Sequence, residues 1–275
     1  MKDSLAHWLA LRERLDAAAR SMTLTQAVAN ALPRGREIRI LDLGTGTGAN
    51  VRFLAPHFPG NQRWLLVDND PAVLADVPRR MSAAARDRLT TVSYVTRQLE
   101  LGARDAPEIF NGCDLVTASA LLDLVSESFV TWLAERCRAS DAIALFALTY
   151  TGRSTCSPAE PEDDWICSLL NRHQKQCDKG FGPAAGPDAV ACAERAFVEA
   201  GYRVRRESSD WQVPPEAGEL QHLLIQGWAD AASEMAPAES ARIADWLARR
   251  RAHVEAGRSR IVVCHEDLAA LPSLG

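Results

Sequence analysis

Short apolar runs alternate with amphipathic stretches through the middle of the chain. Each run has the length and composition of a buried strand. The stretches between them have helical spacing, and Asp70-Pro71 opens one of them with Asp at the N-cap and Pro at the first helical position. This alternation predicts a parallel sheet built from right-handed strand–helix–strand units. The five expected strands are 38–43, 63–67, 91–96, 114–118 and 142–148.

Both ends of the chain have a different pattern. Residues 4–31 have apolar positions at helical spacing and predict two helices before Pro33. Towards the C-terminus, a strand beginning at Gly201 and a last strand at 260–264 enclose two amphipathic helices within 214–257. We therefore expect N-terminal cap helices over 1–35 and a main α/β domain over 36–275, with a helical insertion at 214–257.

Charge and composition limit the partners. The 275 residues carry 31 basic and 36 acidic side chains, a net charge of -5, which argues against nucleic acid or an anionic membrane as the main partner. The sequence shows no apolar run near the ~18 residues of a membrane helix and no secretory signal. The seven cysteines form no C-x-x-C pair, which predicts no metal site and free thiols in the cytoplasm.

A glycine-rich segment carries the clearest chemical signal. Residues 41–50, Leu-Asp-Leu-Gly-Thr-Gly-Thr-Gly-Ala-Asn, follow the first expected strand and open a helix. Glycines at such a turn let the backbone bend sharply and approach a ligand closely. Asp68 ends the next expected strand, where a carboxylate can accept hydrogen bonds from the hydroxyls of a ribose. Together these features predict a cofactor of adenosine type.

Asp42 helps to decide which cofactor this is. The glycines also match the dinucleotide pattern G-x-G-x-x-A through Gly44, Gly46 and Ala49, which taken alone is weak evidence. A carboxylate two residues before the first glycine would repel a pyrophosphate, but it suits a ligand with an ammonium and a sulfonium. A nicotinamide-dependent oxidoreductase therefore remains an alternative, and a disfavoured one.

The acid and the glycines together resemble the first motif of class I S-adenosylmethionine-dependent methyltransferases, E/D-x-G-x-G-x-G. Residues 67–71 resemble the second motif of that family, and 114–123 its fourth strand and following loop, along the methionine part of the cofactor. The chain also resembles an uncharacterised bacterial branch of the family. The resemblance implies S-adenosylmethionine as cofactor and S-adenosylhomocysteine as product. The cofactor-binding residues that it implies are Asp42, Gly44, Thr45, Gly46, Gly48, Asn50, Asp68, Asn69, Glu100, Leu101, Ala118 and Ser119.

The resemblance also implies the fold class. We expect a Rossmann-like, seven-stranded, mostly parallel sheet whose last strand is antiparallel, covered by a helical cap from the N-terminus and from the insertion between the sixth and seventh strands. Family members that modify RNA or DNA amino groups usually carry Asp/Asn-Pro-Pro-Tyr after the fourth strand, where this chain has Ala118-Ser119-Ala120-Leu121. We therefore expect methyl transfer to an oxygen, nitrogen or carbon nucleophile of a small molecule. The alternative is a cofactor-binding protein without catalysis, and a homodimer is left open.

Charged residues on the first helix are candidates for binding this acceptor. Arg12, Asp16 and Arg20 recur every fourth residue, and the first two lie within the apolar arc of the helix. Charges on an apolar face are paired or serve a ligand. Both an ion ladder along the helix and a clamp for a polar acceptor group are consistent with this pattern.

Further candidates follow the later strands. Asp123 and Tyr150 lie after the fourth and fifth expected strands, and Asn171, His173 and Gln174 belong to the next helix. Histidine is a common general base in enzymes, so His173 is a candidate for that role, as is Asp123. Trp211 follows the sixth expected strand. The segment 178–182, Asp-Lys-Gly-Phe-Gly, follows no Walker pattern, and a turn is favoured there over a phosphate-binding loop.

Overall fold

The computed structural model describes residues 2–84 and 92–273. Residues 1, 85–91 and 274–275, which include Thr91 of the third expected strand and the ends of both expected domains, lie outside the described residues. The helices are α1 (Lys2–Ala19), α2 (Met22–Ala31), α3 (Ala49–Leu54), α4 (Pro71–Ala84), α5 (Glu127–Ala139), α6 (Asp163–Gln176), α7 (Ala189–Glu199), α8 (Gly218–Met235) and α9 (Ser240–Glu255). The strands are β1 (Ile38–Leu43), β2 (Gln62–Asp68), β3 (Val92–Gln98), β4 (Leu115–Ser119), β5 (Ile143–Ser157), β6 (Tyr202–Ser208), β7 (Trp211–Val213) and β8 (Arg260–Pro272).

One mostly parallel sheet organises the described residues. The strand order is β3-β2-β1-β4-β5-β8-β6, with β7 also paired to β8. β1 to β5 are parallel, and β8 runs antiparallel to β5, β6 and β7. This confirms the expected Rossmann-like sheet with an antiparallel last strand. The described residues form eight strands instead of the expected seven, because the three-residue β7 adds to the far half of β8.

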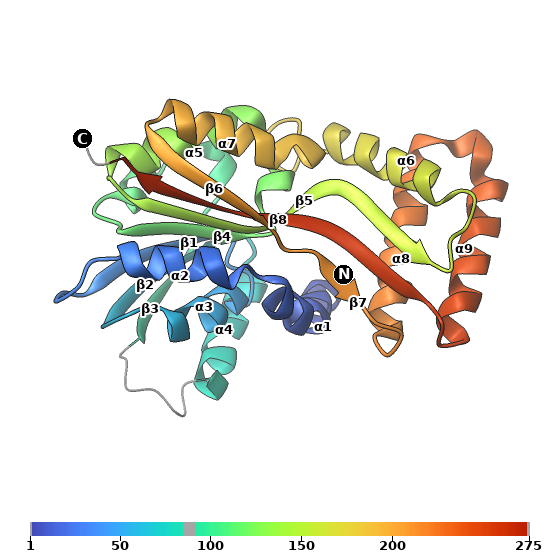
Figure 1. Ribbon diagram of the computed structural model, residues 1–275, viewed down its shortest axis with the longest axis horizontal. Coiled ribbons are helices and arrows are strands. Elements are labelled where there is room, and N and C mark those ends of the chain that lie inside the picture. The colour runs from blue at the N-terminus through green and yellow to red at the C-terminus, as the bar shows by residue number, and fades with distance from the viewer. Residues whose placement is uncertain (1, 85–91, 274–275) are drawn as a thin grey trace.

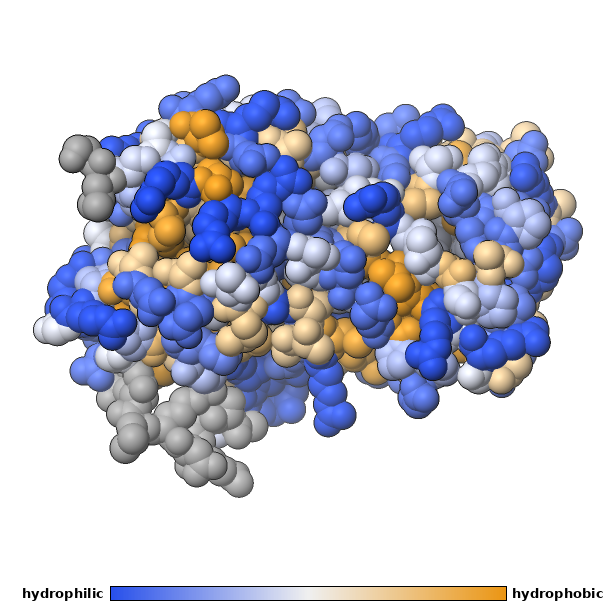
Figure 2. Space-filling model, viewed as in Figure 1, coloured by the Kyte–Doolittle hydropathy of each residue, from blue (hydrophilic) through white to orange (hydrophobic). Residues whose placement is uncertain are grey.

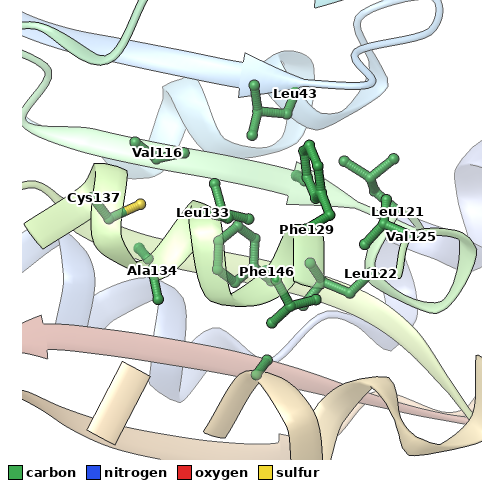
Figure 3. Packing of buried hydrophobic residues seen from close by; sticks show 14 of the residues in the cluster. Leu43, Val116, Leu121, Leu122, Val125, Phe129, Leu133, Ala134, Cys137 and Phe146 are labelled. Carbon is green, nitrogen blue, oxygen red and sulfur yellow. The ribbon is translucent and has the colours of Figure 1, made fainter. Parts of the chain in front are cut away.

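Helices cover both faces of the sheet (Figure 1). β1 is buried on both sides: Ile38 and Ile40 pack with α2 and α3, whereas Leu41 and Leu43 face the layer of α5 and α7. Figure 3 shows the second layer, where Phe129 and Leu133 of α5 lie against Val116 of β4 and Phe146 of β5. A strand with both faces buried reads as a continuous apolar run, which is why the sequence pattern located it.

β5 and β8 are longer than expected and extend beyond the parallel sheet. β5 continues to Ser157, and β8 continues to Pro272, past the expected ends at 148 and 264. Irregular pairing between Phe146 and Thr149 and between Tyr150 and Ser154 bends this ribbon. Its outer half carries α6, α8 and α9 on a separate apolar cluster (Figure 1). α1 packs against β7 and α8, so it belongs with the helices on the outer half of this ribbon.

The N-terminus of α5 offers a test of the local structure. The Ser126 hydroxyl accepts a hydrogen bond from the amide of Phe129 at 3.2 Å. Loss of this cap in Ser126→Ala is expected to lower the free energy of unfolding by about 1 kcal/mol. Urea denaturation measures the change, with Thr131→Ala on the exposed side of the same helix as control. Equal stability of the Ser126 variant and the wild type would show that the cap contributes nothing.

Large apolar side chains on the described surface are scattered over several elements. Figure 2 shows a mostly hydrophilic face on which apolar side chains form separate small patches. The exposed large apolar residues belong to different elements: Leu5, Met22, Val95, Val198 and Leu223. Within residues 2–84 and 92–273, no helix is both long and apolar enough to cross a membrane.

Candidate active site

A cavity of about 910 Å³ opens beside the ends of β1 and β4. These two neighbouring strands are the point at which the strand order of the sheet changes direction. In open α/β sheets, this point at the carboxyl ends of the strands is where ligands bind. The outer part of the cavity is lined by the glycine-rich loop and the ends of β2 and β3. Its inner part reaches between α1, α6, α8 and β8. The cavity therefore joins the sheet to the helical cap.

The glycine-rich loop is a tight turn that only glycine fits well. Gly46 has a φ of +54°, in the left-handed region. A Cβ atom there would lie 3.2 Å from Leu9 Cδ1 of α1. The loop is held at its start by the amide of Thr45, which donates to the carbonyl of Val67 at 2.9 Å. A side chain at position 46 would thus strain the backbone and require the Leu9 side chain to shift by a few tenths of an ångström.

Asp42 supports this loop from beneath and does not line the cavity. Its carboxylate is fully buried and accepts hydrogen bonds from Thr45 Oγ1 and Asn50 Nδ2, both at 2.6 Å. Burial raises the pKa of Asp42 to about 6, although the two hydrogen bonds act in the opposite direction. The expected direct contact of Asp42 with a cationic ligand is therefore wrong for this structure. The side chain fixes the two residues that line the cavity above it.

Asp68 lies at the end of β2, at the outer part of the cavity. Its Oδ2 accepts from the amide of Gly46 at 2.8 Å and its Oδ1 from the amide of Asp70 at 3.0 Å. Each carboxylate oxygen has a second lone pair, so the group can still accept from a ligand. Asn69 and Glu100 lie beside it, 3.5 Å apart between Nδ2 and Oε2. Leu101 completes this end.

Arg20 is not part of a helical ion ladder. α1 ends at Ala19, and the Arg20 side chain turns to the glycine-rich loop, where Nη1 donates to Asn50 Oδ1 at 2.8 Å. Nε lies 3.6 Å from Asp267 Oδ2 of β8, and the guanidinium stacks over Phe53. The side chain is 2 % exposed. A sequence pattern within one helix cannot show a partner 247 positions away.

Several buried donors of the cavity wall have no hydrogen-bond partner among the described residues. They are Arg20 Nε and Nη2, Thr47 Oγ1 and Arg52 Nη2. Donors left unpaired in a protein interior are costly unless a ligand accepts from them. S-adenosylmethionine fits this wall, because it carries a carboxylate at its methionine end and a ribose for Asp68 at the other. Thr47 and Arg52 were not among the expected site residues, since neither matches a motif.

Arg12 and Asp16 form the expected pair on α1. Arg12 Nε donates to both carboxylate oxygens of Asp16, at 2.9 and 3.2 Å. Asp16 also accepts from Trp211 Nε1 at 3.0 Å, and the Arg12 guanidinium lies 4.9 Å from the Trp211 ring. Burial is the largest influence on Asp16 and raises its pKa. All three residues line the inner part of the cavity.

Asp123 lies on the 3-10 turn Leu122–Leu124 after β4, and it also lines the cavity. It is 7 % exposed, and its Oδ2 accepts from Gln174 Nε2 of α6 at 3.2 Å. Burial raises the pKa of Asp123 to about 6, against the positive charges of Arg12 and Lys179. Tyr150 of β5 lines the same region, and burial raises the pKa of its phenol, so the phenol stays protonated at neutral pH.

Two expected site residues on α6 point elsewhere. His173 Nε2 lies 2.9 Å from Glu234 Oε2 of α8, and Asn171 Nδ2 donates to the carbonyl of Gly152 at 2.8 Å. Neither lines the cavity, so the expected base role of His173 and acceptor contact of Asn171 do not hold in this structure. Gly48 and Ala118 also lie behind the wall. The expected site residues that do line it are Arg12, Asp16, Arg20, Gly44, Thr45, Gly46, Asn50, Asp68, Asn69, Glu100, Leu101, Ser119, Asp123, Tyr150 and Trp211.

Strained backbone shapes the inner part of the cavity. Ala120 and Leu148 have φ values of 53° and 55°, which side-chain-bearing residues rarely adopt. The amide of Leu148 donates to Asp267 Oδ1 at 2.8 Å, and the amide of Ala120 to the carbonyl of Ala147. Strain held in this way clusters at functional sites. Asp267 thus positions both Leu148 and Arg20, a role that no local motif indicated.

The segment 178–182 is a turn, as expected. The amides of Gly180, Phe181 and Gly182 all donate to Oδ1 of Asp178, at 2.8 to 3.0 Å. With these donors satisfied within the turn, they are not offered to a phosphate. Lys179 and Phe181 extend from the turn into the cavity wall. Among the described residues, no group of three or more His, Cys, Asp or Glu is arranged to hold a metal ion.

Comparison with known protein families shows that part of this chain is similar to one of them. Residues 40–140 match the family described as "Methyltransferase domain". This match spans β1 to the end of α5 and includes the glycine-rich loop, Asp68 and Asp123. No curated protein is similar enough in sequence to count as a match.

Solved structures with a related fold are distant in sequence. A cyclopropane synthase of Mycobacterium tuberculosis has 12 % identity and a TM-score of 0.46, with coverage of 90 % of this chain and 83 % of the other. A putative sarcosine dimethylglycine methyltransferase of Galdieria sulphuraria has 15 % identity and a TM-score of 0.44, covering 94 % and 86 %. A methyltransferase of Thiobacillus denitrificans, solved with S-adenosylhomocysteine, has 14 % and 0.44, covering 93 % of each chain. None of these likenesses bears on the acceptor.

The family match covers the part of the chain that supplies the cofactor side of the cavity. The same part contains the turn that fits only glycine and the carboxylate at the end of β2. The methyltransferase domain is therefore the family to which residues 40–140 are similar, a range that covers 101 of the 275 residues.

Proposed function

We propose that the protein transfers the methyl group of S-adenosylmethionine to a small molecule enclosed in the inner part of the cavity. The observation that carries this proposal is that one cavity joins the glycine-rich loop to a chamber walled by α1, α6 and α8. The N-terminal segment 1–35 and the insertion 214–257 would thus act as a cap over the acceptor. A chamber lined by several helices and a net charge of -5 both favour a small acceptor over nucleic acid.

The cofactor would lie along the outer part of the cavity. Asp68 would accept hydrogen bonds from the ribose hydroxyls, and Glu100 and Leu101 would flank the adenine. The unpartnered donors of Arg20, Thr47 and Arg52 would receive the carboxylate. When bound, the cofactor supplies a methyl group already activated by the sulfonium. The protein then has to align the acceptor, exclude water and accept one proton.

Asp123 is the residue that we propose as proton acceptor. It lines the cavity, and its Oδ1 has no hydrogen-bond partner among the described residues. Tyr150 would stay protonated beside it and act as a hydrogen-bond donor. We place the reaction in the cytoplasm.

The pH dependence of turnover follows from this role. A general base works in its deprotonated form, and the pKa of Asp123 is raised to about 6. The rate is therefore expected to be low at acidic pH, to rise through about pH 6 and to level off above it. Initial rates of S-adenosylhomocysteine formation between about pH 5 and pH 9 measure this profile. A rate that stays constant across this range would exclude Asp123 as the base.

The proposed function is tested by following the label from methyl-labelled S-adenosylmethionine. The purified protein is incubated with a deproteinised metabolite extract and, separately, with total RNA. We expect label in a low-molecular-mass product and none in RNA. Label in RNA would contradict the small-molecule acceptor. Cofactor that binds but stays intact with every fraction would favour a cofactor-binding protein without catalysis.

A further inference from the structure

The inner part of the cavity contains two neighbouring hydrogen-bond acceptors without partners. Gln174 Nε2 donates to Asp123 Oδ2 at 3.2 Å, which holds the two side chains side by side. The other oxygens of the pair, Asp123 Oδ1 and Gln174 Oε1, are shielded from solvent and have no partner among the described residues. Both residues line the cavity. An acceptor oxygen left unpaired in such a place is costly, and a ligand with hydrogen-bond donors removes the cost.

Aromatic and aliphatic side chains form much of the wall of this inner part, beside the Arg12–Asp16 pair. The rings of Trp8 and Trp211 lie 6.3 Å apart between centroids, and His265 continues the wall 5.2 Å beyond Trp211. Burial lowers the pKa of His265 to about 4, so this ring is neutral at physiological pH. Leu170, Leu224 and Trp228 also line the cavity and belong to the same apolar cluster as Trp8 and Trp211. Such a chamber suits an apolar body of aromatic size with one polar end.

The nearby charges leave Asp123 as an anion available to a ligand. Arg12 is hydrogen-bonded to Asp16 and stacked on Trp211, so its charge is already compensated. Lys179 also reaches the cavity wall, and its charge favours the ionised form of Asp123. Asp123 itself is bonded to a neutral amide, that of Gln174. A cationic donor would therefore gain a charge-assisted hydrogen bond at Oδ1.

The number of donors distinguishes the three kinds of nucleophile. A hydroxyl carries one hydrogen and can serve only one of the two oxygens. A carbon nucleophile carries no donor, whereas an amine nitrogen carries two or more and can serve both. We infer that the methyl acceptor is a primary amine on an apolar, aromatic-sized body, with its nitrogen held by Asp123 Oδ1 and Gln174 Oε1. This inference rests on the proposed function and narrows it to N-methylation.

The amine enters as an ammonium and passes one proton to Asp123 Oδ1, which frees its lone pair. The nitrogen attacks the methyl carbon, so that an N–C bond forms while the C–S bond of the cofactor breaks. The product is a secondary ammonium, which carries the positive charge that the sulfonium loses. Asp123 returns its proton to water after the product has left.

Matched pairs of amines and alcohols test the inference without relying on turnover. Calorimetric titrations at about pH 8, with saturating S-adenosylhomocysteine, compare 2-phenylethylamine with 2-phenylethanol and tryptamine with its alcohol analogue. Each amine is expected to bind at least about tenfold more tightly than its alcohol. Equal binding, tighter binding of the alcohols, or no binding of either amine at millimolar concentration would overturn the inference.

Variants show whether the named pair is responsible. Gln174→Leu is expected to remove most of the preference for the amine. Gln226→Leu, the same change at a half-buried position on α8 outside the cavity wall, is expected to leave it intact. Loss of the preference in both variants, or in neither, would also overturn the inference.

The identity of the methylated product distinguishes failure of this inference from failure of the proposed function. Methylation at oxygen or carbon of an acceptor would overturn the inference and leave the proposed function standing. An amine that is bound with the expected preference but never methylated would support amine recognition, and it would contradict the proposed function.

Discussion

Replacement of Asp68 by alanine is expected to weaken the binding of S-adenosylhomocysteine by about 100-fold, because hydrogen bonds from a ligand to a charged acceptor are lost. Asp68 also accepts from the amide of Gly46 at 2.8 Å, so the same change loosens the turn beneath the cofactor. Both effects lower affinity. Titration calorimetry of the variant and the wild type measures the difference.

A second variant separates these two effects. Asp68→Asn keeps the shape of the side chain and one acceptor oxygen but removes the charge. We expect its affinity to fall between those of the wild type and of Asp68→Ala. Asp105→Ala, an exposed position outside the cavity wall, serves as control and should bind as the wild type does. Unchanged affinity in Asp68→Ala would contradict the placement of the ribose at the end of β2.

Replacement of Asp123 by asparagine is expected to lower turnover by about 10²- to 10⁴-fold, the usual contribution of a positioned general base. Asparagine has nearly the same size, so it fills the same space beside Gln174, but it cannot accept a proton. The variant should bind S-adenosylhomocysteine as tightly as the wild type, because Asp123 lies at the inner part of the cavity. Initial rates with the acceptor found in the labelling experiment measure the loss.

The pH profile of this variant provides an independent check. The rise in rate through about pH 6 should disappear along with the group that titrates there. Thermal unfolding shows whether the variant is folded. A variant that keeps the full rate and the same pH profile would show that the proton leaves by another route.

The sheet was predictable because its signals are local. β1 and β4 are buried on both faces and therefore appear as continuous apolar runs. The glycine-rich turn and Asp68 were predictable for a similar reason: their positions follow from the strand ends that precede them. The lengths of β5 and β8 were not, because their outer halves alternate between more and less buried positions under a cap formed by distant helices.

The direct roles of charged residues were harder to predict. Asp42 was correctly placed at the loop but wrongly assigned to the ligand, since only the folded structure shows Thr45 and Asn50 closing over it. Arg20 matched a helical spacing, yet its partners come from α3 and β8. Long-range pairing of this kind leaves no pattern within a single segment of sequence.

Titration of the purified wild-type protein with S-adenosylhomocysteine and, separately, with NADH tests the central claim most directly. The cavity wall described here predicts binding of S-adenosylhomocysteine with a dissociation constant of micromolar order and no binding of NADH. Binding of NADH alone would contradict the assignment of the glycine-rich loop to a methyl donor. Binding of neither ligand would contradict the claim that this cavity holds an adenosine-type cofactor at all.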